Sequence, residues 1–344
     1  MRSYFLKYLY SHVSKSMGAG LLAALLLSFA VGCGGTKPQT PAASTSTPPT
    51  TSPSSATPAP TTTPTSTPTP TSTPSPSTTP TPAPHGPVIV VAEENHGYSS
   101  VIGNSAMPYL NSLAQQYGLA TQFYANTHPS IGNYFMLTTG QIFTNDDTFT
   151  GTVPVDNLVS HLIAAGKTWK SYAESLPTVG YTGGNSGAYL ERHNPFSYFS
   201  DVRNSSTQQQ NLVSFSQFKA DLNAGTLPDF SFVVPNSSDD AHNGTPGTAD
   251  AWLQQNIGPV LSSAQFQNGG LLIVWFDEAE TIDSTHGGGH VAVVMAGPNV
   301  KTGFQSTTLY QHQDLLNTIA NYMGIDPNIG GAGTATNMSE FFKP

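Results

Sequence analysis

Three clusters of acidic residues stand after apolar, strand-like runs of this sequence. The clusters are Glu94 with Asn95, Asp239-Asp240-Ala241-His242, and Asp277 with Glu278. Carboxylates that come together repel one another and lose hydration, so a fold that gathers them needs a compensating charge, usually a divalent cation. A solvated turn is the alternative for Asp277 and Glu278. The fully apolar strand that would deliver two adjacent acids favours the metal site.

Ser130 is the candidate nucleophile. It follows Pro129 and precedes the apolar run 134–137, which predicts that it stands at the start of a helix. Amide donors and the helix dipole receive phosphate at such a position. A serine hydroxyl is a weak nucleophile until a metal or a base lowers its pKa. Ser130 can also be a simple N-cap of that helix, and the two roles are compatible.

Several histidines are candidates for the same chemistry. His286 and His290 bracket the glycine run 287–289, which allows the backbone to pass close to a metal or a phosphate. We expect one of the two to bind metal, and we favour His290 because it opens an apolar strand that would fix its position. His128 is placed to donate to phosphate or to protonate a leaving group near Ser130. A hydrogen-bonded loop histidine is the alternative for His128.

The elements that must position these residues are those of an α/β domain. Short, unalternating apolar runs predict buried parallel strands, and they cover residues 87–92, 228–234, 270–276 and 291–296. Helical patterns cover residues 107–117, 156–165 and 310–323. This alternation predicts a mostly parallel central sheet with helices on both faces. Ligands bind outside the carboxyl ends of such strands, where the acidic clusters stand.

Several separated segments resemble one known family when they are taken in order. They are Val91-Ala-Glu-Glu-Asn95, Met107-Pro-Tyr-Leu-Asn-Ser-Leu-Ala114, Thr127-His-Pro-Ser-Ile-Gly-Asn-Tyr134 with Thr139-Gly140, Trp169-Lys-Ser-Tyr-Ala-Glu174, Arg192-His-Asn-Pro-Phe196, Val234-Pro-Asn236 with Asp240 and His242, and Phe276-Asp-Glu278. The family is the bacterial and fungal phosphoesterases, which include acid phosphatases and phospholipases C and belong to the alkaline phosphatase superfamily. The resemblance runs from about residue 88 to residue 323, and it implies an alkaline phosphatase-like fold.

The resemblance also implies two sets of metal ligands. One cation would be held by Glu94, Asn95, Ser130, Asp277 and Glu278, and a second by Asp240, His242 and His290. Asn95 stands where the superfamily usually has aspartate, and Glu278 where it usually has histidine. Oxygen ligands there favour Mg²⁺, Ca²⁺ or Mn²⁺ over Zn²⁺. Fewer negative ligands also mean weaker metal binding, so a site that holds one metal is the alternative to a site that holds two.

Two substrate contacts follow from the resemblance as well. In related nucleotide pyrophosphatases, an asparagine three residues after the nucleophile contacts the phosphate. Ser130 and Asn133 keep this spacing, so Asn133 is expected to stabilise the phosphate oxygens. His193 lies in a family-like segment and is expected to face the substrate, which would be a phosphate-ester small molecule or a phospholipid head group.

Residues 1–33 predict a lipoprotein signal peptide. A positively charged start precedes an apolar run that is shorter than the roughly 20 residues of a membrane span. The run ends in Ala30-Val-Gly-Cys33, which resembles a bacterial lipobox. Cys33 is the only cysteine in the chain and the expected site of lipidation. Ordinary signal cleavage with an incidental thiol is the alternative.

Residues 34–85 consist almost entirely of Thr, Ser, Pro and Ala, which predicts a disordered linker. Residues 86–344 then form the expected catalytic domain. We therefore expect an exported protein that is lipid-anchored to the cell envelope or secreted. The formal net charge of −9 and the absence of a basic stripe argue against nucleic acid as a partner.

Together these features predict a hydrolase that cleaves phosphate esters through a metal-activated serine. We expect a phosphomonoesterase of the acid phosphatase type, because no further β-rich domain follows the catalytic unit as it does in longer phospholipases C. A phospholipase C or another phosphodiesterase on the same scaffold is one alternative. The other is a non-catalytic surface binding module on a stalk, which the intact Ser130 and acidic clusters disfavour.

Overall fold

The computed structural model describes residues 85–344. The predicted signal peptide, the lipidation site Cys33 and all but the last residue of the predicted linker lie outside this range. Within it, the strands are β1 (Val88–Glu93), β2 (Gly118–Tyr124), β3 (Trp169–Ala173), β4 (Leu212–Ser214), β5 (Phe230–Val234), β6 (Leu271–Phe276), β7 (His290–Ala296) and β8 (Phe304–Ser306).

The α-helices of the same range are α1 (Tyr98–Val101), α2 (Pro108–Gln116), α3 (Ser130–Thr139), α4 (Leu158–Ala164), α5 (Ser200–Arg203), α6 (Ser206–Gln209), α7 (Phe215–Ala224), α8 (Pro246–Asn256), α9 (Ala264–Gln267) and α10 (His312–Met323). Short 3₁₀ helices include η1 (Glu191–His193) and η4 (Thr285–Gly287). All four predicted strands and all three predicted helices are present as β1, β5, β6, β7, α2, α4 and α10.

The strands form one eight-stranded sheet in the order β4-β3-β5-β1-β6-β7-β2-β8. β1 pairs in parallel with β5 and β6, and β3 pairs in parallel with β4 and β5. β7 runs antiparallel to both of its neighbours, β6 and β2. The sheet is therefore mixed, which corrects the expectation of a mostly parallel sheet.

The connection between β6 and β7 explains the antiparallel strand. A parallel neighbour needs a crossover that carries the chain back along the sheet, and this crossover is usually an α-helix. Residues 277–289 contain only the short η4 between the two strands. The chain therefore turns back at the edge where β6 ends, and β7 begins at that same edge.

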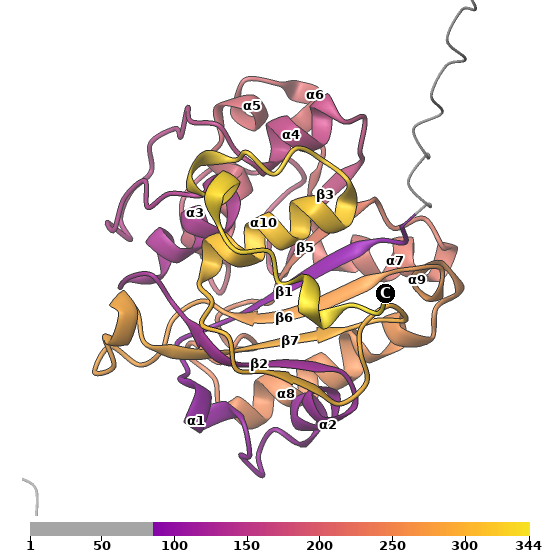
Figure 1. The fold of residues 1–344 in the computed structure, drawn as a ribbon. Helices are drawn as coiled ribbons and strands as arrows, with labels where there is room; N and C mark the ends of the chain where they lie inside the picture. The colour runs from indigo at the N-terminus through magenta and orange to yellow at the C-terminus, as the bar shows by residue number, and fades with distance from the viewer. Residues whose placement is uncertain (1–84) are drawn as a thin grey trace, which may run out of the picture. The chain divides into compact units, whose positions relative to one another are not determined.

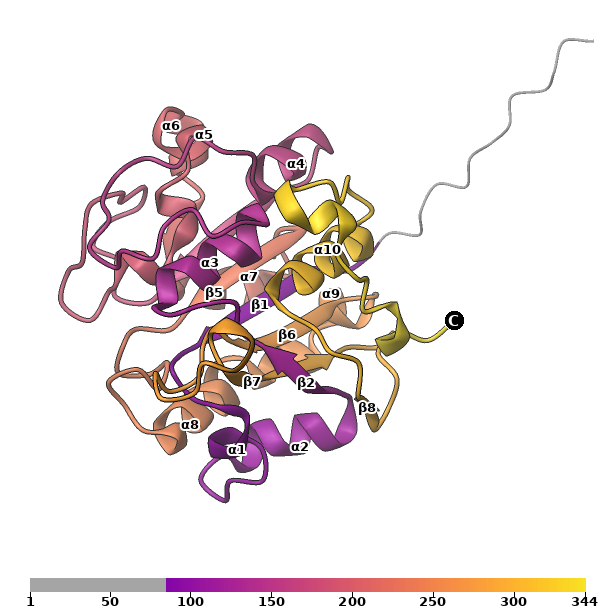
Figure 2. The same ribbon diagram turned by 60° about the vertical axis from the view of Figure 1, so that its left-hand side comes forward.

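Helices cover both faces of the sheet, as expected (Figures 1 and 2). α3 and α10 pack together on one face, and α2 packs with α8 on the other. Trp275 of β6 marks the first face, because its ring packs edge-on against Tyr134 of α3 and its Nε1 donates to Nδ1 of His312 in α10 at 2.9 Å. Asp250 of α8 marks the second face, since its carboxylate accepts the N–H of Leu110 in α2 at 2.8 Å.

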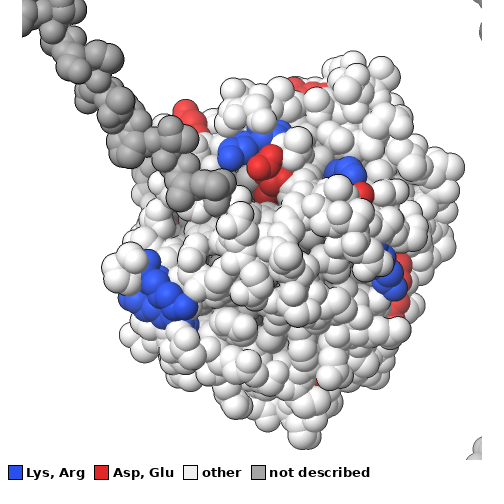
Figure 3. Space-filling model, turned by 90° about the vertical axis from the view of Figure 1, so that its right-hand side faces the viewer, with Lys and Arg blue, Asp and Glu red and all other residues white. Residues whose placement is uncertain are grey.

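The surface carries few charges. On the face shown in Figure 3, Lys and Arg residues are scattered among uncharged residues. A search of residues 85–344 for a helix with the length and apolar character of a membrane span finds none.

Candidate active site

Three neighbouring strands, β5, β1 and β6, end at the same edge of the sheet, and their ends are joined through the backbone. The N–H of Glu94 donates to the carbonyl oxygen of Asp240 at 2.8 Å, and the N–H of Asp277 donates to that of Glu93 at 3.1 Å. Asn95 has a φ of 54°, in the left-handed region that asparagine tolerates better than most residues. Its N–H donates to Oδ1 of Asp277 at 3.3 Å. The polar residues after all three strands therefore meet.

Ser130 lies at this edge as the first residue of α3, with 2% of its surface exposed. Its hydroxyl lies within donating distance of Oε2 of Glu94, at 3.1 Å, and of Oε1 of Glu278, at 3.0 Å. The other oxygen of Glu278 lies 2.5 Å from Nδ1 of His128. The second ring nitrogen of His128 donates to the carbonyl oxygen of Asp283 at 2.8 Å. The serine oxygen is thus held between two carboxyl groups.

Burial raises the pKa of four carboxyl groups of the site, those of Glu94, Asp240, Asp277 and Glu278. The pKa of Glu94 lies well above its usual range because the side chain is fully buried and because Asp277 and Asp240 add negative charge. Burial, with the charge of Glu278 added, also raises the pKa of Asp277. Burial raises the pKa of Glu278 and that of Asp240 to about 7. A bound cation would relieve the cost of ionising such a group of acids.

The donor atoms of the site fit a divalent metal. Oδ2 of Asp277 is buried and makes no hydrogen bond within residues 85–344, although buried polar atoms are nearly always paired. Glu94, His193 and His242 each offer one ligand atom, and the three atoms lie within 4.8 Å of one another. Carboxylate oxygens and imidazole nitrogens are common metal ligands. This group of residues could therefore hold a metal ion.

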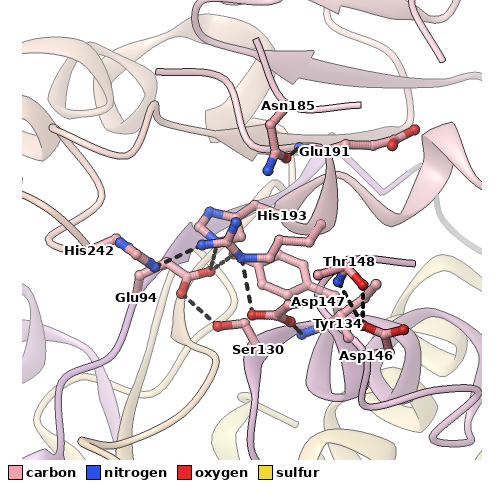
Figure 4. A network of polar contacts seen from close by, with 12 residues as sticks. Glu94, Ser130, Tyr134, Asp146, Asp147, Thr148, Asn185, Glu191, His193 and His242 are labelled. Carbon is pink, nitrogen blue, oxygen red and sulfur yellow. Dashed lines mark hydrogen bonds and ion pairs between the residues drawn. The ribbon is translucent and has the colours of Figure 1, made fainter. Parts of the chain in front are cut away.

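His193 stands among these groups, above Glu94 and Ser130 in Figure 4. Its Nδ1 lies 3.2 Å from Oδ2 of Asp240, and its Nε2 lies 3.2 Å from Oε1 of Glu94. The second contact lacks hydrogen-bond geometry, so Nε2 has no hydrogen-bond partner among the described residues. Burial lowers the pKa of His193 well below its usual value. A neutral ring keeps one nitrogen lone pair available for a metal.

Tyr134 supports this arrangement from the second turn of α3. Its hydroxyl donates to Oε1 of Glu94 at 2.5 Å, and its ring stacks on His193 with 5.4 Å between ring centroids. Both contacts are fully buried, so they fix the orientation of a carboxyl group and an imidazole ring that belong to the same cluster.

One guanidinium group lies among the acids. Arg192 donates from Nη2 to Nε2 of His242 at 2.9 Å, and its Nε lies 3.3 Å from Oδ2 of Asp147. The other oxygen of Asp147 accepts the N–H of Ile131 at 3.2 Å. Arg192 and Asp147 therefore lie beside the first turn of α3, next to Ser130.

Most residues predicted for the site meet at this edge of the sheet. They are Glu94, Asn95, Ser130, Asp240, His242, Asp277 and Glu278, together with His128 and His193. His193 is predicted as a substrate contact, and the structure places it in the group that could hold a metal. His128 is predicted to donate to phosphate or to the leaving group, and both of its ring nitrogens face protein oxygens instead.

His290 does not lie with Asp240 and His242, contrary to the prediction. It opens β7, and β6 separates β7 from β1 and β5 in the sheet. Its Nε2 donates to the carbonyl oxygen of Thr121 at 3.0 Å, and its ring stacks against Tyr98 with 4.4 Å between centroids. His290 therefore belongs to the packing between β7 and β2.

The glycine run 287–289 is expected to pass close to a metal or a phosphate, and it packs against the backbone of Asn126 and Thr127 instead. A Cβ atom on Gly287 would lie 2.0 Å from the carbonyl oxygen of Asn126, and one on Gly288 would lie 2.2 Å from that of Thr127. Glycines are required because the backbone of this run passes close to the loop that precedes Ser130. No metal or phosphate contact is needed to explain them.

Asn133 does not point a free amide toward the nucleophile. Its Oδ1 accepts the N–H of Asn126 at 3.0 Å and that of Thr127 at 3.2 Å, and its Nδ2 donates to the carbonyl oxygen of Thr127 at 2.8 Å. The side chain is fully buried. The structure therefore gives Asn133 the task of fixing the loop before Ser130, in place of the predicted phosphate contact.

Three residues of the site are not singled out by the sequence interpretation. Tyr134 reads as an ordinary helix residue, and Arg192 reads only as part of a family-like segment. Basic residues are rare in this chain, which has only 11 Lys and Arg residues. The position of Arg192 directly before the candidate residue His193 could therefore have indicated that it belongs to the site. Asp147 lies in the loop after α3, where the sequence offers no local signal for a long-range contact.

Comparisons with known proteins show the family of the chain. The model of the phosphoesterase family matches residues 98–326. The chain is 34% identical over 260 residues to a phosphatidylinositol-3-phosphatase of Mycobacterium tuberculosis, a match that covers 74% of this chain and 82% of that protein. It is 29% identical over 242 residues to a probable acid phosphatase of Kluyveromyces lactis, which covers 67% of this chain and 56% of the yeast protein.

A solved structure shares the fold. A protein of the alkaline phosphatase superfamily from Vibrio parahaemolyticus superposes with a TM-score of 0.55 and 13% sequence identity, over 76% of this chain and 70% of that one. At this identity the likeness concerns the fold alone, which is alkaline phosphatase-like. This chain spans little more than half the length of the yeast relative.

Proposed function

The chain belongs to the phosphoesterase family and is a hydrolase that acts on phosphate esters, and we propose that it is a metal-dependent phosphomonoesterase with Ser130 as its nucleophile. The observation that carries the proposal is the position of the Ser130 hydroxyl, at the start of α3 and within 3.1 Å of both Glu94 and Glu278. A helix start supplies amide donors for phosphate, and neighbouring carboxylates supply an acceptor for the hydroxyl proton.

In the proposed reaction, the Ser130 oxygen attacks the phosphorus of the ester, and its proton passes to Glu94 or Glu278. The bond between phosphorus and the leaving oxygen breaks, and the alcohol leaves after taking up a proton. Water then attacks the phosphoserine, which releases inorganic phosphate and restores the serine hydroxyl. His128 holds Glu278 from its other side and so orients this carboxylate toward Ser130.

The residues that would hold a metal are Glu94, Asn95, Asp277 and Glu278 beside Ser130, and Asp240, His193 and His242 next to them. A bound divalent cation would lower the pKa of the serine hydroxyl and balance the charge of the phosphate. The oxygen-rich set around Ser130 favours Mg²⁺, Ca²⁺ or Mn²⁺, and the two imidazoles also admit Zn²⁺.

The relatives support a monoester as substrate. The Mycobacterium relative is named a phosphatidylinositol-3-phosphatase, and the Kluyveromyces relative is named a probable acid phosphatase. We therefore include phosphorylated lipid head groups with small phosphate monoesters as candidate substrates. The alternative of a non-catalytic binding module is not retained, because the family is one of hydrolases.

We also propose that the protein is exported and attached to a membrane through lipid on Cys33, which lies outside the described residues. The lipobox-like segment that ends at Cys33 supports this proposal. In cells that express the full chain, Cys33→Ser should move the protein from the membrane fraction to the soluble fraction. A Cys33→Ser protein that stays in the membrane fraction would rule out this anchor.

Hydrolysis of a substrate panel tests the catalytic proposal. The purified protein should hydrolyse p-nitrophenyl phosphate far faster than p-nitrophenylphosphorylcholine, should lose activity in EDTA and should recover it when metal is restored. Ser130→Ala should abolish turnover. Ser200→Ala is a matched control, because Ser200 also begins a helix and lies in α5. Preference for the diester would assign a phosphodiesterase instead, and activity that persists in EDTA would overturn the metal requirement.

A further inference from the structure

The backbone N–H that follows the candidate nucleophile Ser130 is hydrogen-bonded to a carboxylate of the protein, that of Asp147. Oδ1 of Asp147 accepts the N–H of Ile131 at 3.2 Å, and its Oδ2 lies 3.3 Å from Nε of Arg192. Figure 4 shows Asp147 reaching toward Ser130 from the loop that also carries Asp146 and Thr148. One anionic group thus bridges a helix N–H and a guanidinium beside the serine.

The N–H of Ile131 and the guanidinium of Arg192 lie beside the oxygen of Ser130, to which a transferred phosphoryl group would bond. Ile131 directly follows Ser130, so its N–H lies in the first turn of α3, whose amide groups have no partner within the helix. A phosphoryl group that bonds to the serine oxygen must place its other oxygens close to that turn. Among the Lys and Arg residues of the described chain, Arg192 alone contacts the site. Guanidinium groups bind phosphate oxygens well.

The position of Asp147 fits a group that can leave. Its side chain is 31% exposed, and both of its neighbours in sequence are exposed. The loop is anchored on either side by Phe143 and Phe149, whose rings pack against each other at 5.7 Å and against Phe135 of α3. Only the polar tip between these anchors has to move for Asp147 to swing away.

We propose that Arg192 and the N–H of Ile131 form the seat for the oxygens of the transferred phosphoryl group, and that Asp147 fills this seat until the phosphate of a substrate displaces it. The inference rests on the proposed function, whose site it completes. Asp147 accepts the N–H of Ile131 and forms an ion pair with Arg192, whose Nε has no hydrogen-bond partner among the described residues. Asp147 then competes with phosphate, since both are anions that would lie against the same amide group and the same guanidinium. Its departure also removes a negative charge that would repel the incoming group.

A fixed role for Asp147 makes the opposite prediction. If Asp147 only holds Arg192 in place while phosphate binds elsewhere, loss of its charge loosens Arg192 and weakens phosphate binding. If Asp147 is a competitor, the same change removes the charge that holds it against Arg192 and weakens its hold on the N–H of Ile131, so phosphate displaces it more easily and binds more tightly. The sign of the change in affinity therefore decides between the two roles.

The experiment measures the affinity of the full, metal-loaded protein for inorganic phosphate by titration calorimetry. Asp147→Asn should tighten binding, and Arg192→Gln should weaken it by roughly tenfold, the effect of one lost charge-assisted hydrogen bond. Asp146→Asn is the matched control. Asp146 carries the same charge on the same loop, but its carboxylate accepts hydrogen bonds only from Thr148, at 2.9 and 2.6 Å, so its replacement should leave the affinity unchanged.

The outcomes separate this inference from the proposed function. Weaker or unchanged phosphate binding by Asp147→Asn would overturn the inference, even if the wild-type protein hydrolyses esters through Ser130. Tighter binding by Asp147→Asn together with a wild-type protein that hydrolyses no ester would uphold the phosphate seat and overturn the function. Because Asp147 lies in an exposed loop, its variant should fold, and a melting curve checks this.

Discussion

The Nε2 atom of His193 lies 3.2 Å from Oε1 of Glu94, and no hydrogen bond joins the two atoms. A buried, neutral imidazole that faces a buried carboxylate in this way is a natural place for a cation. His290, the ligand that the sequence favours, donates its own Nε2 to a backbone carbonyl instead.

The two histidines should therefore differ in their effect on metal binding. We expect His193→Asn to weaken the binding of a divalent metal by at least roughly tenfold, the loss typical of even an outer partner of a metal site. His290→Gln should change metal affinity little, although it will disturb the stacking with Tyr98. Calorimetric titration of metal into the EDTA-treated variants measures both. Equal losses, or a larger loss for His290→Gln, would contradict the observed grouping.

The stability of the metal-free protein should fall as the pH rises. The pKa of Glu278 and that of Asp240 are raised to about 7 in the folded state, while both lie near 4 when exposed. Between these values the folded state binds more protons than the unfolded state, so the free energy of unfolding decreases with pH. At about 1.4 kcal/mol for each pKa unit, the change is of the order of a few kcal/mol.

Melting curves at pH 5 and pH 7.5 check this expectation. In EDTA, the protein should melt at a higher temperature at pH 5 than at pH 7.5. With saturating metal, the difference between the two melting temperatures should shrink or change sign, because the cation binds the ionised carboxylates and metal binding releases protons. A metal-free protein that is more stable at pH 7.5 would show that the acids are paired in some other way.

Replacement of Asn133 should lower the stability of the fold. Asn133→Ala removes three hydrogen bonds, two of them buried, and leaves the N–H groups of Asn126 and Thr127 without their acceptor. We expect a loss of about 2 kcal/mol or more in the free energy of unfolding. Denaturant unfolding measures it, with the exposed Asn328→Ala as control. A variant with full stability and reduced phosphate affinity would restore the role predicted from spacing.

The sequence predicts the edge of the sheet at which the site forms, and the reason is local. Apolar runs such as 87–92 and 270–276, short and rich in β-branched or aromatic residues, are typical of buried strands, and the acids that follow them are then confined to the strand ends. Glu94, Asp277 and Glu278 meet Ser130 for this reason. The helix start at Ser130 is likewise predicted by local residues, Pro129 before it and the apolar run 134–137 after it.

Other features depend on contacts that no local pattern contains. β7 is an apolar run like β1 and β6, and its antiparallel direction follows from the missing crossover helix before it. This direction places His290 beside β2, while His193 comes from the short η1, where no apolar strand marks its position. β2 and β3 mix polar residues into partly buried strands, so their pattern is weak. Asp147 reaches the site from a loop, and only the folded chain shows the contact.

Covalent trapping tests the central claim most directly. The protein is mixed with a phosphate monoester labelled on phosphorus, quenched in acid and digested, and the labelled peptide is sequenced. The account predicts that the label resides on Ser130, that Ser200→Ala retains it and that Ser130→Ala has neither label nor turnover. Hydrolysis by Ser130→Ala at the wild-type rate, or label on another residue, would contradict the account.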